Sequence, residues 1–131
     1  MKQIEVVAGI IEHDKKILCM QRDVGKFDYV SLKWEFPGGK IEAGETNEQA
    51  LKRELKEEME LEVDIINHFT DVEYQYPDFI IKMYCYKCKA KNKDFKLNVH
   101  KDFKWLTKND LKTLDWAPAD LPVVEKILKE E

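Results

Sequence analysis

The pattern that most restricts the fold of this chain is a capped amphipathic helix that directly follows a glycine-rich break. The segment Thr46-Asn47-Glu48-Gln49 matches a capping box, in which the first and fourth side chains bind each other's backbone N–H groups. Before it, Pro37-Gly38-Gly39 and Gly44 predict an irregular loop up to Glu45. Behind it, apolar residues at helical spacing predict a helix of about 14 residues. These residues are Ala50, Leu51, Leu55 and Met59.

The rest of the chain is rich in β-forming runs. Two runs flank the polar residues 13–16 and predict a hairpin, while Trp34 and Phe36 alternate with Glu35 as on one side of a short strand. The expected strands are residues 4–11, 17–21, 33–36, 61–71, 78–90 and 103–106.

Two further helices are expected near the C-terminal end. A short one covers 107–111 with Thr107 as its cap, and a longer one covers 121–128. The apolar face of the longer helix is expected to hold Leu121, Val124, Ile127 and Leu128. The expected order of elements, mainly strands with one central and one terminal helix, predicts an α+β or α/β sandwich. Residues 1–131 are expected to form a single domain.

Composition and charge narrow the class of protein. Hydrophobic residues make up 44% and charged residues 37% of the chain, which is typical of a globular protein. No apolar run approaches the roughly 20 residues that span a bilayer, and the N-terminus lacks a basic leader, so no membrane contact and a cytoplasmic location are expected. The net charge of -4 argues against a protein that grips a nucleic-acid polymer.

The three cysteines, Cys19, Cys85 and Cys88, do not suggest a disulfide framework because their number is odd. Cys85 and Cys88 form a CxxC inside a strand-like run, where a spacing of three sends the two side chains to opposite faces. Buried thiols are therefore expected here in preference to a zinc site.

The central helix carries three glutamates at a spacing that suggests metal binding. Glu54, Glu57 and Glu58 stand at i, i+3 and i+4, so their side chains project from one face. At an effective dielectric of about 20, each pair repels by roughly 3 kcal/mol before screening, which a cation would relieve. Carboxylates are typical ligands of Mg²⁺. The alternative is a solvated helix face relieved by neighbouring basic side chains at 52, 53 and 56.

Residues 39–61, reading GKIEAGETNEQALKRELKEEMEL, resemble the Nudix box. That pattern is Gly, five residues, Glu, seven residues, Arg-Glu, an aliphatic, one residue, Glu-Glu, one residue, Gly, an aliphatic. The positions filled here are Gly39, Glu45, Arg53, Glu54, Leu55, Glu57, Glu58 and Leu61. The chain departs from it at Glu60, where the family has glycine in a left-handed turn, at a cost on the order of 1 kcal/mol.

The resemblance implies both a fold and a set of roles. It implies an α/β/α sandwich with a mixed β-sheet, a catalytic helix behind a glycine-rich loop, and a C-terminal helix. It implies that the carbonyl of Gly39 and the carboxylates of Glu54, Glu57 and Glu58 hold Mg²⁺, with Mn²⁺ able to substitute. Glu54 is also a candidate to deprotonate the attacking water. Arg53 and Glu45 match family residues that orient this cluster.

Further runs resemble the MutT branch of the family, which includes 8-oxo-dGTP diphosphatases and CTP pyrophosphohydrolases. They are residues 4–11, 34–42, 74–78 and 117–122. The resemblance implies a nucleoside triphosphate pyrophosphohydrolase that releases the monophosphate and pyrophosphate, acting on CTP, dCTP or an oxidised purine such as 8-oxo-dGTP. The alternatives are a Nudix hydrolase of dinucleoside polyphosphates, nucleotide sugars or ADP-ribose, and a Nudix module that binds nucleotides without cleaving them. A monomer or a homodimer is compatible with the sequence.

Asp120 matches the position at which this branch reads the base. An ionised Asp only accepts hydrogen bonds, which favours a base with an exocyclic amine such as cytosine. The alternative is that Asp120 caps the last helix.

The remaining candidates for substrate contact each have a plainer alternative. Trp34, Phe36 and Tyr76 are candidates to stack on the base, or are core residues. Arg22 is a candidate for a phosphate or base contact and Lys40 for neutralising phosphate, or both are surface residues. Many relatives carry another glutamate in the loop before Trp105-Leu106, but Val99 occupies that place here, and Asp102 is the candidate to replace it. The number of metal ions and the general base are left open.

Overall fold

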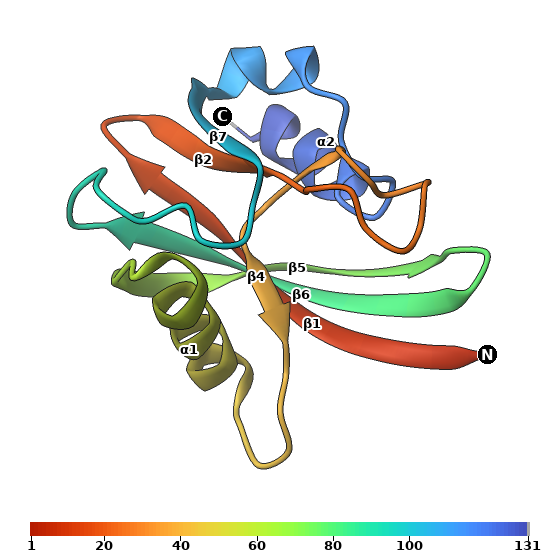
Figure 1. Cartoon of the computed structure of the whole chain (residues 1–131). Helices are drawn as coiled ribbons and strands as arrows, with labels where there is room; N and C mark the ends of the chain where they lie inside the picture. Colours follow the sequence, from red (N-terminus) through yellow and green to blue (C-terminus); the bar gives the residue numbers. More distant parts are fainter. Residues whose placement is uncertain (131) are drawn as a thin grey trace.

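A mixed seven-stranded β-sheet runs through the molecule, and one α-helix lies on each of its sides (Figure 1). The computed structural model describes residues 1–130. The strands are β1 (Lys2–His13), β2 (Lys16–Gln21), β3 (Trp34–Glu35), β4 (Gly38–Lys40), β5 (Val63–Gln75), β6 (Phe79–Ala90) and β7 (Asp102–Thr107). The helices are α1 (Asn47–Met59), the 3-10 helix η1 (Lys108–Thr113) and α2 (Leu121–Lys129).

The sheet is ordered β3-β2-β1-β6-β5, with β4 added to β1 and β7 added to β2. The pair β1 and β6 is parallel and the other pairs are antiparallel, which confirms the mixed sheet. The expected hairpin around residues 13–16 is present as β1 and β2. The expected connection through residues 76–78 joins β5 to β6.

The expectation of irregular chain throughout residues 37–45 was wrong for the short strand β4. Val7 pairs with Gly39 and Ala8 with Gly38 in an antiparallel register. A Cβ atom at Gly38 would overlap the Val7 carbonyl, so only glycine allows this close approach. Glycines that read as loop residues in the sequence therefore bring the segment before α1 against the central strand.

The core has two layers because side chains alternate along the central strands. Ile17 and Cys19 of β2 pack with α2, whereas Leu18 and Met20 pack with α1. Cys85 belongs to the α2 layer and Cys88 to the α1 layer, which confirms that they face opposite ways. All three cysteines are free and buried, and burial raises the pKa of the Cys19 and Cys88 thiols to about 12.

The boundaries of α1 follow the predicted pattern. The Gln49 N–H donates to Thr46 Oγ1 at 3.1 Å and the Thr46 N–H donates to Gln49 Oε1 at 2.9 Å, which is the reciprocal capping box. The helix ends at Glu60, whose backbone is left-handed with φ 51° and ψ 37°. The predicted left-handed turn without glycine is therefore present.

The two C-terminal helices differ in detail from the expectation. In α2, Val123 is buried while Leu121 is 44% exposed, because the buried stripe is centred on Val123 and Ile127 and Leu121 is rotated towards solvent. The expected short helix is the 3-10 helix η1. Thr107 stands before it, but its hydroxyl donates to the Asp110 carboxylate and caps no backbone N–H. Across residues 1–130, no helix is long and apolar enough to cross a membrane.

Candidate active site

Arg53 on α1 gathers the acidic groups predicted from the sequence. Its Nε and Nη2 donate to the two oxygens of Glu45 at 2.6 and 2.9 Å, while Nη1 donates to Glu54 at 3.0 Å and to Glu57 at 3.1 Å. Nη2 also donates to the Lys40 carbonyl at 3.0 Å, which fixes the loop before the helix. The hydrogen bonds from Arg53 hold the pKa of Glu45 below its ordinary value. Arg53 and Glu45, which were predicted to orient the cluster, thus form a bidentate ion pair.

Gly39 on β4 lies directly against Glu54. A Cβ atom built at this position would overlap the Glu54 carboxylate, so any side chain would push that carboxylate away. The antiparallel pairing of Gly39 with Val7 holds the loop at this distance. The glycine at the start of the motif therefore allows the β4 backbone and the α1 carboxylate to meet.

The three glutamates on α1 are placed differently from one another. The side chain of Glu54 is 13% exposed and that of Glu57 is 61% exposed, and both carboxylates accept a hydrogen bond from Arg53. Burial, and after it the charge and hydrogen bond of Glu54, raise the pKa of Glu58 to about 7. In the described part of the chain, residues 1–130, no three His, Cys, Asp or Glu side chains form a group able to hold a metal ion. Arg53 therefore binds two of the three glutamates, Glu54 and Glu57, and the charge of Glu54 acts on the third, Glu58.

This arrangement has a simple electrostatic cause, and it fits a cation. Three carboxylates on one helix face repel each other. Here the guanidinium of Arg53 binds Glu54 and Glu57 and relieves part of this repulsion, and the charge of Glu54 raises the pKa of Glu58. A divalent ion among the same oxygens would relieve the remaining repulsion, and carboxylate and carbonyl oxygens are the donors that Mg²⁺ prefers. The chemistry of the donor set thus fits a hard cation.

Asp120 lies at the start of α2. Its side chain is buried, and its Oδ2 accepts a hydrogen bond from the Phe36 N–H at 2.9 Å. It occupies the N-cap position of α2, but its side chain makes no capping hydrogen bond. Burial, followed by repulsion from Glu35, raises the pKa of Asp120 well above its ordinary value. Asp120 therefore ties α2 to the segment between β3 and β4, which leads into the carboxylate helix.

The aromatic candidates are packed on other rings. Phe36 stacks on Trp116 with ring centroids 4.7 Å apart, and Tyr76 stacks on Tyr29 with centroids 5.3 Å apart. Trp34 is buried in the α2 layer, with the ammonium of Lys104 over its ring. In the structure these three rings pack against other side chains, as expected for core residues. Their contact with a base stays a prediction.

The two basic candidates lie on the surface. Arg22 donates from Nη1 to Glu35 at 3.1 Å, and its side chain is 44% exposed. Lys40 is exposed, and its carbonyl is bound by Arg53. Both side chains are accessible to a phosphate, which leaves their predicted contacts as predictions.

Sequence reasoning missed Glu35 and His100. The Glu35 carboxylate is bound by Arg22 and by His100 Nε2, at 3.1 and 2.9 Å. Its charge raises the pKa of both Glu58 and Asp120. The alternation at 34–36 places Glu35 on the opposite side from the two aromatic rings, and that was the available signal. His100 carries no signal because it lies in a loop.

The two loop positions discussed as metal ligands face solvent. Val99 is 56% exposed, and Asp102 at the start of β7 is exposed with its Oδ1 bound to the N–H of Phe103.

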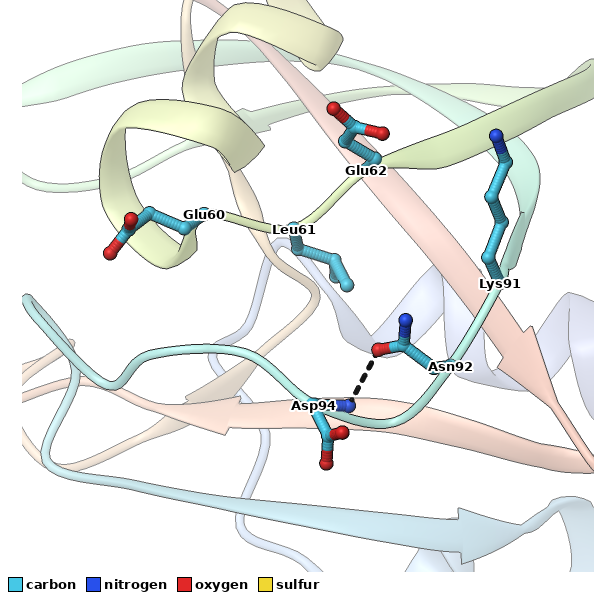
Figure 2. Close-up of a pocket in the computed structure, with 6 residues that line it drawn as sticks. All are labelled: Glu60, Leu61, Glu62, Lys91, Asn92 and Asp94. Carbon is cyan, nitrogen blue, oxygen red and sulfur yellow. Dashed lines mark hydrogen bonds between the residues drawn. The ribbon is translucent and has the colours of Figure 1, made fainter.

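A pocket with a volume of about 200 Å³ lies beyond the end of α1 (Figure 2). It is lined by Glu60, Leu61, Glu62, Lys91, Asn92 and Asp94. None of these is a predicted site residue, and charges of both signs line it. Figure 2 also shows the Asp94 N–H donating to Asn92 Oδ1, at 2.9 Å, which folds the start of the loop over residues 91–101. This pocket is separate from the carboxylate cluster.

Comparison with known proteins gives consistent matches. A family model described as NUDIX domain matches residues 1–127. The CTP pyrophosphohydrolase of Escherichia coli K12 is 35% identical over 128 residues, 98% of this chain and 93% of that protein. The 8-oxo-dGTP diphosphatase of the same organism is 32% identical over 127 residues, covering 97% of this chain and 98% of its own.

The fold is matched equally well among solved structures. The solution structure of a protein named DNA mismatch repair protein MutT, of the family Nudix hydrolase, from methicillin-resistant Staphylococcus aureus 252 has a TM-score of 0.78. It is 42% identical, and the match covers 100% of both chains.

Proposed function

This chain belongs to the Nudix family, and from that premise we propose that it is a Mg²⁺-dependent hydrolase that cleaves a nucleoside triphosphate to the monophosphate and pyrophosphate. One observation carries the proposal: Arg53 gathers Glu45, Glu54 and Glu57 beside Gly39, so the motif residues meet at one place in the fold. The similarity over nearly the full length to a CTP pyrophosphohydrolase and an 8-oxo-dGTP diphosphatase supports the class of substrate.

The residues that would hold Mg²⁺ are Glu54, Glu57, Glu58 and the carbonyl of Gly39. When bound, the ion would neutralise phosphate charge and make water a better nucleophile, with Mn²⁺ able to substitute. Arg53 and Glu45 keep the glutamates in place, because an ion pair with two parallel hydrogen bonds fixes both side chains. Lys40, exposed at the end of β4, supplies positive charge for the phosphates.

Asp120 is the residue proposed to read the base. One of its oxygens is bound to the Phe36 N–H, and the hydrogen bonds of the described residues leave the other without a donor. A base with an exocyclic amine, such as cytosine N4, would supply that donor. Uracil and thymine lack this amine. Arg22 is proposed to contact the phosphate or the base from the end of β2.

A screen of triphosphates with Mg²⁺ tests both parts of the proposal. CTP, dCTP, UTP, dTTP, dGTP and 8-oxo-dGTP are compared by kcat/KM, and the products are separated by ion exchange. We expect monophosphate and pyrophosphate, with CTP and dCTP cleaved well ahead of UTP and dTTP. Diphosphate and inorganic phosphate as products, or no hydrolysis of any triphosphate, would overturn the reaction. Equal rates on the four pyrimidine nucleotides would overturn the role of Asp120.

A further inference from the structure

Strand β7 forms one edge of the sheet, and its outer side is unpaired. It pairs with β2 alone, from Lys16 opposite Thr107 to Gln21 opposite Asp102. Among residues 1–130, no backbone hydrogen bond joins its outer side to another segment. An unpaired edge is a surface on which a further extended strand can pair. The edge of β7 is therefore a candidate interaction surface.

The backbone of Phe103 faces this free side. The Phe103 N–H donates to Oδ1 of Asp102 at 2.8 Å, so it is turned away from β2. Backbone groups alternate along an antiparallel strand, so Trp105 and Thr107 face the same way as Phe103. A partner strand would thus bind the backbone of these three residues.

Exposed apolar side chains are concentrated beside the edge of β7. Of eight large apolar side chains that are exposed within residues 1–130, Leu97, Val99 and Phe103 lie within seven positions of the chain. The ring of Phe103 contacts that of Phe95, with centroids 4.7 Å apart, and this contact holds it in place. Apolar surface gathered in one place is typical of an interface.

The long strand β5 at the other edge of the sheet is not suited to regular pairing. Two register shifts interrupt its pairing with β6, between Ile65 and Asn67 and between His68 and Thr70. Irregularities of this kind bend a strand and keep another strand from pairing along its edge. The pairing of β7 with β2 has no such shift, so β7 is the regular edge.

The sequence of β7 is complementary to itself in one antiparallel register. With Phe103 opposite the same residue of a second copy, Asp102 of each copy lies opposite Lys104 of the other. These are non-hydrogen-bonded pairs, in which the side chains approach most closely. Moving the centre by one residue in either direction puts two aspartates or two lysines opposite each other, which is unfavourable.

The two charged side chains are available for these pairs. Asp102 Oδ1 binds the Phe103 N–H, and the Lys104 ammonium lies over the Trp34 ring, 5.4 Å from its centroid. Within the described part of the chain, neither side chain has an oppositely charged partner. A second copy would supply the opposite charge to both.

We propose that two copies of this chain associate by antiparallel pairing of their β7 edges, with Phe103 on the two-fold axis. Each Asp102 then forms an ion pair with Lys104 of the other copy, and the two sheets become continuous. The paired surface is small, so the dimer dissociates at low concentration. Of the monomer and the homodimer that the sequence allows, the geometry thus selects a reversible homodimer.

Sedimentation equilibrium tests the association. One chain has a mass of 15.5 kDa, and the average mass should rise towards twice this value as the concentration increases from micromolar to millimolar. Asp102→Lys and Lys104→Asp each put like charges opposite one another at two symmetric places. Each variant should raise the Kd of the dimer by about 10-fold or more. The double variant exchanges the two charges, so it should associate more tightly than either single variant.

The matched control is Lys112→Asp, the same change of charge at an exposed position of η1. It should associate like the unchanged protein, and circular dichroism should show the same fold for all variants. A mass of one chain at every concentration would overturn the inference. So would single variants that associate as tightly as Lys112→Asp, or a double variant that associates no more tightly than the single ones.

A disulfide between copies tests the register independently. In Phe103→Cys the two new thiols lie on the two-fold axis, with Cα atoms about 5.5 Å apart, which a disulfide can span. The three natural thiols are buried and should not react. Under mild oxidation Phe103→Cys should form the covalent dimer much faster than Asn109→Cys, an exposed control on η1. Equal rates would overturn the register. Neither test measures hydrolysis, so this inference and the proposed function stand or fall separately.

Discussion

The Asp120 carboxylate accepts a hydrogen bond from the Phe36 N–H at 2.9 Å, joining segments 84 positions apart in the chain. This bond ties the start of α2 to the segment between β3 and β4, which leads into the carboxylate helix. Asp120 is buried there, and repulsion from Glu35 adds to burial in raising the pKa of its carboxyl group. The start of α2 is therefore attached to the backbone that leads towards β4 and the carboxylate helix.

Asp120→Asn should change how stability depends on pH. The pKa of Asp120 is raised in the folded protein, so the folded state holds this proton more tightly than the unfolded state does. Its contribution to stability is thus greatest at low pH and is lost as pH rises from its unfolded pKa, about 3.9, through its folded pKa. Asn does not ionise, so urea unfolding should show the variant gaining stability relative to the unchanged protein as pH rises from 4 to 7.

The control for this prediction is Asp115→Asn, because Asp115 is 73% exposed and pairs with Lys33 on the surface. Surface pairs of this kind contribute little to stability. If the unfolding free energies of Asp120→Asn and the unchanged protein differed by the same amount at every pH from 4 to 7, the expectation would be contradicted. The same variant should also narrow the preference for CTP over UTP, if Asp120 reads the base.

Glu57→Gln should lower kcat by two or more orders of magnitude and leave the fold intact. The side chain is largely exposed, so its replacement by an amide of the same size disturbs no core contact. Its expected contribution is a carboxylate for Mg²⁺, which an amide supplies poorly. Turnover with saturating Mg²⁺ and the circular dichroism spectrum are the measurements. Glu48→Gln, an exposed substitution in the first turn of the same helix, is the control, and near-normal activity of Glu57→Gln would reject the metal role.

Arg53→Lys should weaken the whole cluster although the charge is kept. The guanidinium binds both oxygens of Glu45 and also reaches Glu54 and Glu57, which a single ammonium cannot do at once. We expect activity to fall by about 10- to 100-fold, with more Mg²⁺ needed for half-maximal rate, as is usual for residues behind metal ligands. A titration of activity against Mg²⁺ measures this, and an unchanged titration curve would show that the clamp is dispensable.

Glu60→Gly should stabilise the protein. Glu60 has a left-handed backbone, and glycine relieves a cost of about 1 kcal/mol at such a position. The variant loses the ion pair between Glu60 and Lys96, but both side chains are exposed and the pair is worth little. Glu60→Ala removes the same ion pair and keeps the strain, so it is the control. Equal unfolding free energies for the two variants in urea would show that the backbone is not the cause.

The sequence by itself determined the features that depend on local periodicity. The capping box and the apolar spacing fixed α1, because a helix repeats every few residues whatever packs on it. The alternation of side chains along a strand placed Cys85 and Cys88 on opposite faces of the sheet. The resemblance to the family motif implied that Arg53 and Glu45 orient the cluster, and their ion pair is present across eight positions.

Only the tertiary structure decided which distant side chains meet. Glu35 and His100 are 65 positions apart, and the chain between them gives no sign that its loop returns to β3. Strand β4 was missed because its glycines are read locally as a break, whereas pairing with β1 is a long-range contact. Periodicity reports which face of an element a residue is on, but only packing selects its partner, and at this site the partners fix the charge and orientation of each group.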